Sequence, residues 1–133
     1  MPRTERWRGR WDTARAVALL CRARLLISLV PFSRWRGTLG CVGAADLAKA
    51  QHRARLIEWG AMRLPFATKC LPRAMALSWL LRRESLGHTV VLAVRPSASR
   101  GSDSDLHAWV EVAGTVILGD LPGPWVETLR LGA

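Results

Sequence analysis

The hydrophobic pattern of the chain changes at Gly87 from helical to extended. Residues 70–84 are apolar almost all round, with Pro72 in the first turn and Gly87 beyond the end, as is typical of a central, buried helix. Residues 89–94 (TVVLAV) form a continuous run rich in β-branched side chains, which predicts a strand covered on both faces. Helices followed by strands predict an α+β fold, with N-terminal helices and a central buried helix packed on a small antiparallel sheet.

Two further helices are predicted in the N-terminal half. The first begins at Asp12 or Thr13, either of which can cap it, and ends near Val30, because a proline follows. After a glycine-rich break at 37–43, the second spans about 44–62 and presents an apolar stripe to the core. That inner stripe comprises Leu47, Ala50, Ala54, Ile57 and Ala61.

Two more strand-like runs, 106–112 and 115–118, are separated by Ala113-Gly114, which favours a tight two-residue hairpin turn. A two-residue turn pairs Val112 with Thr115. If the pairing continues residue by residue from there, His107 lies directly opposite Asp120. Side chains opposed in this way lie about 4.5 to 5.5 Å apart at Cβ. A three-residue loop would instead turn Asp120 to the opposite face, so the pairing depends on the register.

The chain has 133 residues, half of them apolar, which is enough to bury one hydrophobic core. We expect a single domain over 1–133, with a helical N-terminal part at 1–64 and the central helix and the sheet at 65–133. The only low-complexity stretch is 96–105, which is rich in Ser, Gly and Asp.

The formal charge of +10 belongs to the N-terminal half, where residues 1–63 hold 13 Lys and Arg against 4 Asp and Glu. The arginines are scattered along predicted helices and form no short basic run, so nucleic acid is not an expected partner. Two explanations remain, a solvated arginine-rich face and a docking surface for an acidic protein, a peptide or a membrane. Arg53 and Arg55 are the candidates for binding a substrate or partner.

The three cysteines, Cys21, Cys41 and Cys70, are an odd number without a CxxC pair. This favours free thiols in a reducing compartment over a disulfide framework or a zinc site. Residues 13–30 contain three arginines and are too charged for a signal sequence or a membrane span. We therefore expect a soluble, cytoplasmic protein.

Cys70 stands at the predicted start of the buried helix, beside Lys69. A helix N-terminus favours a thiolate through its unpaired N–H groups and its positive dipole end, and the same N–H groups can stabilise an oxyanion. If Asp120 holds one nitrogen of His107, the other can face the thiol, as in a Cys-His-Asp triad. Such chemistry needs no metal or organic cofactor.

Each of these residues also has an ordinary structural explanation. A buried cysteine is often a small hydrophobe, a strand histidine is often merely hydrogen-bonded, and Asp120 before Leu-Pro-Gly-Pro can be a turn former. Cys21 in mid-helix and Cys41 in a glycine-rich loop are weaker nucleophile candidates, and His52 and His88 are expected at the surface. The combination of a helix-start cysteine, a strand histidine and a cross-strand aspartate nevertheless favours a catalytic triad.

Two stretches, KCLPRAMALSWLLRRESLGHTVVLAVR and LHAWVEVAGTVILGD, resemble the B proteins of lasso-peptide biosynthesis, which are transglutaminase-like, papain-related leader peptidases. The resemblance covers about residues 65–121 and implies a triad of Cys70, His107 and Asp120. It also implies that the chain is a cysteine peptidase that cuts the leader from a ribosomally made precursor peptide. A separate ATP-dependent lasso cyclase would then close the macrolactam ring.

Some B proteins carry an N-terminal leader-recognition domain rich in strands, whereas residues 1–65 here are predicted to be helical. The resemblance therefore implies a stand-alone peptidase half that receives the precursor from a separate leader-recognition protein. Two alternatives stay open. One is a transglutaminase-like acyltransferase or amidase with the same triad, because the triad leaves the acceptor undefined. The other is a basic module that binds nucleic acid or another anion, with a structural Cys70.

Overall fold

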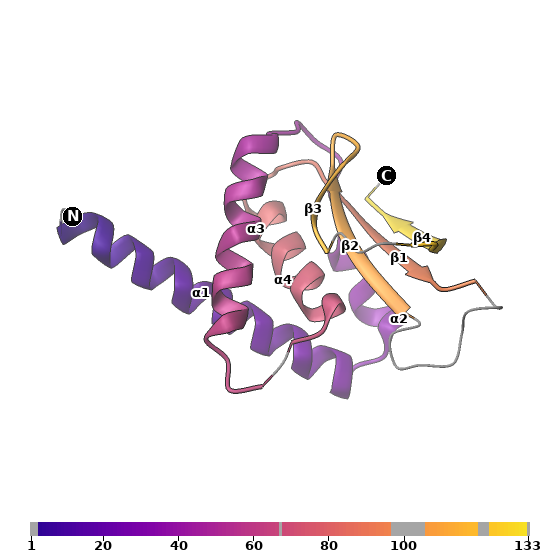
Figure 1. The fold of residues 1–133 in the computed structure, drawn as a ribbon, viewed down its shortest axis with the longest axis horizontal. Helices are drawn as coiled ribbons and strands as arrows, with labels where there is room; N and C mark the ends of the chain where they lie inside the picture. Colours follow the sequence, from indigo (N-terminus) through magenta and orange to yellow (C-terminus); the bar gives the residue numbers. More distant parts are fainter. Residues whose placement is uncertain (1–2, 67, 97–105, 120–122, 133) are drawn as a thin grey trace.

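The structure is a computed structural model that describes residues 3–66, 68–96, 106–119 and 123–132. In agreement with the predicted α+β class, helices α1, α3 and α4 lie on one side of a four-stranded antiparallel sheet (Figure 1). The helices are α1 (Arg3–Leu29), α2 (Phe32–Trp35), α3 (Leu47–Met62) and α4 (Cys70–Arg83), and a 3-10 turn, η1, spans Arg36–Thr38. The strands are β1 (Thr89–Val94), β2 (Leu106–Val112), β3 (Thr115–Leu118) and β4 (Val126–Leu131).

The strand order is β3-β2-β1-β4, which places β1 inside the sheet. Its four inner residues, 90–93, are all buried, so the prediction of a strand covered on both faces is confirmed. Val90 and Leu92 join the main core together with Ala108 and Val110 of β2. Side chains alternate along a strand, so residues 107, 109 and 111 of β2 project from the face that points away from α4.

Helix α4 is the centre of the fold, as its apolar sequence predicts. It packs against α1, α3 and β2, and Met75, Leu77 and Leu81 have no exposed surface. Burying one such side chain stabilises the fold by roughly 1.5 to 3 kcal/mol. The same packing fixes the position of the first residue of α4, Cys70.

The N-terminal half differs from its prediction at three places. Helix α1 begins at Arg3 rather than at residue 12 or 13, because Arg and Glu are strong helix formers and continue the helix without an apolar stripe. Its N-terminal end extends beyond the rest of the molecule (Figure 1). The predicted glycine-rich break is preceded by α2 and overlaps η1. Helix α3 begins at Leu47, where the Asp46 carboxylate accepts a hydrogen bond from the N–H of Lys49 at 3.1 Å.

His88 was expected at the surface, and that prediction is wrong, because its side chain is buried. Its Nδ1 donates to the carbonyl oxygen of Leu86 at 2.9 Å, so its Nε2 accepts from the Ser78 hydroxyl at 2.7 Å. Ser78 Oγ in turn accepts from the N–H of Gly40 at 2.8 Å. This chain of hydrogen bonds joins α4 to the start of β1. His52 is exposed, as expected.

Candidate active site

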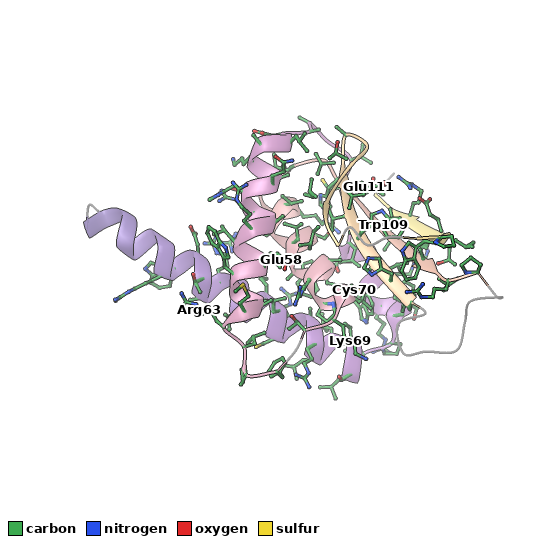
Figure 2. The ribbon with its side chains drawn as sticks, in the orientation of Figure 1. Glu58, Arg63, Lys69, Cys70, Trp109 and Glu111 are labelled. Atoms are coloured by element: carbon green, nitrogen blue, oxygen red, sulfur yellow. The ribbon has the colours of Figure 1, made fainter. Side chains whose placement is uncertain are left out.

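Cys70 is the first residue of α4, as predicted, and its side chain is half-buried. The N-cap residue, Lys69, makes no capping hydrogen bond with its side chain, and Pro72 carries no N–H. The N–H groups of Cys70 and Leu71 are therefore left without an intrahelical acceptor, directly beside the sulfur. Figure 2 shows Cys70 and the exposed Lys69 together at this end of α4. The arrangement supplies backbone donors where an acyl-transfer intermediate would need them.

Cys70 lines a cavity of about 350 Å³. Three of its lining residues come from the last turns of α1, and the others come from the segment before α4, from α4 itself and from the start of β2. They are Arg24, Ile27, Ser28, Thr68, Lys69, Cys70, Leu71, Pro72 and Leu106. Cys70 is thus reachable by a ligand rather than enclosed in the core.

His107 is the second residue of β2, and only 6% of its surface is exposed. Its Nε2 lies 2.5 Å from the carbonyl oxygen of Gly119. A carbonyl oxygen only accepts, so Nε2 carries the proton in this contact and Nδ1 is the basic nitrogen of the neutral ring. This is the tautomer that a general base requires when the group that orients it lies on the Nε2 side.

Cys70 lies against the beginning of β2, beside the residue that precedes His107. The Cys70 sulfur lies 4.0 Å from the carbonyl oxygen of Leu106, the residue before His107. The imidazole itself is on the sheet face that points away from α4, beside the end of the strand. Among the residues that the structure describes, no hydrogen bond joins the thiol to the imidazole. Catalytic hydrogen bonds of this kind often tighten only when a substrate is bound.

The hairpin after β2 has the predicted two-residue turn but not the predicted constant register. Val112 pairs with Thr115 and Glu111 with Val116, whereas beyond a β-bulge Val110 pairs with Leu118. We expected His107 directly opposite Asp120 on the assumption that the register stays the same along the whole hairpin. That assumption is wrong, because the register shifts by one residue between Val110 and Glu111. Asp120, together with Asp103 and Asp105, lies outside the described residues. The role of Asp120 therefore remains a prediction, although its neighbour Gly119 contacts the imidazole.

Aromatic rings surround His107, and sequence reasoning did not include them in the site. Trp125, which precedes β4, stacks on the imidazole with ring centroids 5.0 Å apart and an angle of 29°. Trp109 lies on the same face of β2, 5.8 Å away, and the Arg95 guanidinium lies 4.7 Å from the centre of the Trp125 ring. The i, i+2 spacing of His107 and Trp109 was the available signal. The contact between Trp125 and His107 joins residues far apart in the chain, so no local sequence pattern indicates it.

Of the two arginines expected to bind a partner, only Arg55 is exposed. Arg53 is half-buried, and its guanidinium donates two hydrogen bonds to the Glu84 carboxylate, at 2.7 and 2.8 Å. The hydrogen bond from Arg53 lowers the pKa of Glu84 from its usual value. Arg53 thus ties α3 to the end of α4 instead of pointing freely into solvent. Arg55 stays a candidate for docking.

Cys21, Cys41 and Cys70 are all half-buried free thiols. Cys41 forms an isolated backbone bridge with His88. The preceding residue, Gly40, bonds to Ser78 in the second half of α4, whereas Cys70 is at the start of that helix. Neither Cys21 nor Cys41 lines the cavity at Cys70. Cys70 is thus the cysteine with both a helix start and a cavity beside it.

A family model described as transglutaminase-like superfamily matches residues 13–128, which is most of the chain. The chain therefore belongs to the transglutaminase-like superfamily, and this membership indicates activity of the cysteine peptidase or acyltransferase type. Neither the curated proteins nor the solved structures include a match. None of the helices in the described ranges is long and apolar enough to cross a membrane.

Proposed function

We propose that this protein is a cysteine peptidase that removes the leader from a lasso-peptide precursor before macrolactam cyclisation. The observation that carries the proposal is the position of Cys70, at an uncapped helix start, in a cavity and against the start of the strand that bears His107. Superfamily membership supports acyl transfer through a cysteine. The motifs KCLPRA and HAWVEV support the finer assignment by their resemblance to lasso-peptide B proteins.

In the proposed mechanism, His107 Nδ1 takes the thiol proton of Cys70 as the sulfur attacks the scissile carbonyl carbon. The N–H groups of Cys70 and Leu71 stabilise the oxyanion that forms. The imidazolium then gives its proton to the leaving amine, which departs as the N-terminus of the core peptide. Water, deprotonated by His107, releases the leader from the thioester. Asp120 holds the imidazole in its working orientation, next to the contact with Gly119.

Two protein partners belong to this proposal. A separate leader-recognition protein delivers the precursor, as the resemblance to the B proteins implies, and residues 3–66 of this chain form helices and a 3-10 turn. An ATP-dependent lasso cyclase then uses the exposed core peptide. Delivery by a partner raises the effective concentration of the precursor at Cys70.

The proposal is tested by incubating the protein and its leader-recognition partner with candidate precursor peptides and weighing the products by mass spectrometry. We expect free leader with a new carboxyl terminus and free core peptide. Transfer of the leader to an added amine without hydrolysis would instead identify an acyltransferase. If the peptides stay intact while the protein binds nucleic acid with a steep dependence on salt, the chain is a basic binding module.

A further inference from the structure

We infer that the last turns of α1 form a specificity pocket beside Cys70, which holds an aliphatic side chain of the substrate next to a carboxylate of the same peptide. This inference rests on the proposed peptidase function and adds a substrate class to it. It assigns a binding role to Arg24 and Ile27, which the sequence analysis did not include in the site.

The lining of the cavity defines the chemistry of its ligand. Apolar surface comes from Ile27, Leu71, Pro72 and Leu106, which suits an aliphatic side chain. Two cations, Arg24 and Lys69, line the same cavity, and none of the described lining residues is acidic. A carboxylate beside the aliphatic group would therefore meet complementary charge. At about 350 Å³ the cavity has room for more than one small side chain.

The wall that α1 contributes continues a buried face of this helix. Leu20 and Ala23 lie two turns and one turn before Ile27 on that face, are 1% and 0% exposed, and belong to the core that includes α4. The Arg24 guanidinium lies 3.9 Å from the centre of the Phe66 ring, which holds its charge near the cavity. A pocket wall fixed in this way can discriminate between side chains, because it does not yield to fit a poor ligand.

Alkylation of Cys70 tests the pocket without any substrate peptide. Three reagents are compared: iodoacetamide, N-isoamyl iodoacetamide, which adds an aliphatic arm, and iodoacetate, which adds a negative charge. The rate at each cysteine is read by peptide mass mapping, with Cys21 and Cys41 as internal references. For each reagent, the alkylation rate at a cysteine is divided by the rate of iodoacetamide at the same cysteine. We expect this ratio to be higher at Cys70 than at Cys41 for both N-isoamyl iodoacetamide and iodoacetate.

Two variants with matched controls localise the effect. Ile27→Trp fills the cavity and should slow the isoamyl reagent at Cys70 about tenfold, with little change for iodoacetamide. Leu29→Trp is the control, since Leu29 is 76% exposed on the same helix and does not line the cavity. Arg24→Glu should remove the preference for iodoacetate, whereas Arg34→Glu, at an exposed site outside the cavity, should keep it.

Equal effects of Ile27→Trp and Leu29→Trp, or an iodoacetate preference that survives Arg24→Glu, would overturn the inference. Circular dichroism and unchanged alkylation at Cys21 establish that each variant is folded, and Ile27→Ala, which enlarges the cavity, replaces Ile27→Trp if that variant unfolds. Precursor cleavage by the wild-type protein is measured in parallel. Cleavage without the reagent preferences rejects the pocket alone, and the preferences without cleavage reject the peptidase proposal alone.

Discussion

The imidazole of His107 donates from Nε2 to the carbonyl oxygen of Gly119, across a distance of 2.5 Å. This bond joins the second residue of β2 to the residue that follows β3. It fixes the ring against rotation and leaves Nδ1 as the basic nitrogen. A backbone carbonyl can hold this orientation whichever carboxylate completes the site.

Gly119→Ala should reduce peptide cleavage by about tenfold or more without unfolding the protein, because loss of an orienting contact of the base is costly in an active site. Gly119 has a φ of +84°, and an added Cβ would lie 2.8 Å from the carbonyl oxygen of Ala108. Gly114→Ala is the control, since Gly114 has a similar φ of +79° but nothing within 4 Å of an added Cβ. Both kcat/KM and its pH profile should change in the first variant only. Similar losses in the two variants would mean that backbone strain, not the contact with His107, is responsible.

Arg53→Met should lower the free energy of unfolding by about 1 to 2 kcal/mol, because a bidentate pair with a carboxylate is stronger than an ordinary surface ion pair. The bond to Arg53 lowers the pKa of Glu84 in the folded protein. The stabilisation from this pair is therefore fully present above the pKa of Glu84 in the unfolded chain, about 4.3, and is lost as the pH falls. Urea unfolding at neutral pH and at about pH 3.5 measures this. Arg55→Met, on the same helix but exposed, should leave stability nearly unchanged. Equal effects of the two variants would contradict the structural role of Arg53.

His88 should make the protein less stable at mildly acidic pH. Burial lowers the pKa of His88 in the folded protein, so the unfolded chain binds the proton more tightly. The free energy of unfolding therefore falls as the pH drops below about 6.5, and the contribution of neutral His88 is complete above that value. In His88→Gln this part of the pH dependence should disappear, while His52→Gln, at an exposed site, should keep it. Unfolding curves at several pH values decide between these outcomes.

Partner-dependent cleavage should slow at low salt when Arg55 is replaced by Glu, because charge on the N-terminal half speeds the encounter. The isolated chain should cleave its precursor poorly and be strongly activated by the leader-recognition protein. Arg83→Glu serves as the control, since Arg83 is exposed but lies on α4. Equal cleavage rates with and without the partner would contradict the two-protein proposal, whatever the effect of Arg55→Glu on the rate.

Local patterns predicted most of the fold. Helix α4, strands β1, β2 and β3, and the turn at Ala113-Gly114 follow from apolar runs and turn residues that act within a few positions. Strand β4 was not predicted, because its sequence VETLRL has little local signal and its strand form depends on pairing with β1. His88 was misplaced for a similar reason, since its partner Ser78 is ten residues away on another element.

The places of two candidate residues in the fold were predicted. Cys70 was expected at the start of a buried helix and His107 in a strand, because both elements are visible in the sequence. Their catalytic roles stay predictions. The β-bulge between Val110 and Glu111 was not predictable from the turn, since the turn residues fix only the pairs next to them. The cavity wall from α1 was missed because packing between helices, not spacing along the chain, brings Ile27 to Cys70.

The most direct test replaces each cysteine in turn and measures precursor cleavage in the presence of the leader-recognition partner. Cys70→Ala should abolish cleavage, while Cys21→Ala and Cys41→Ser should retain it, because only Cys70 combines a helix start with the cavity and the neighbouring His107 strand. Folding of each variant is checked by circular dichroism. Cleavage by Cys70→Ala at the wild-type rate, or its loss in Cys41→Ser alone, would contradict the assignment of Cys70 as nucleophile.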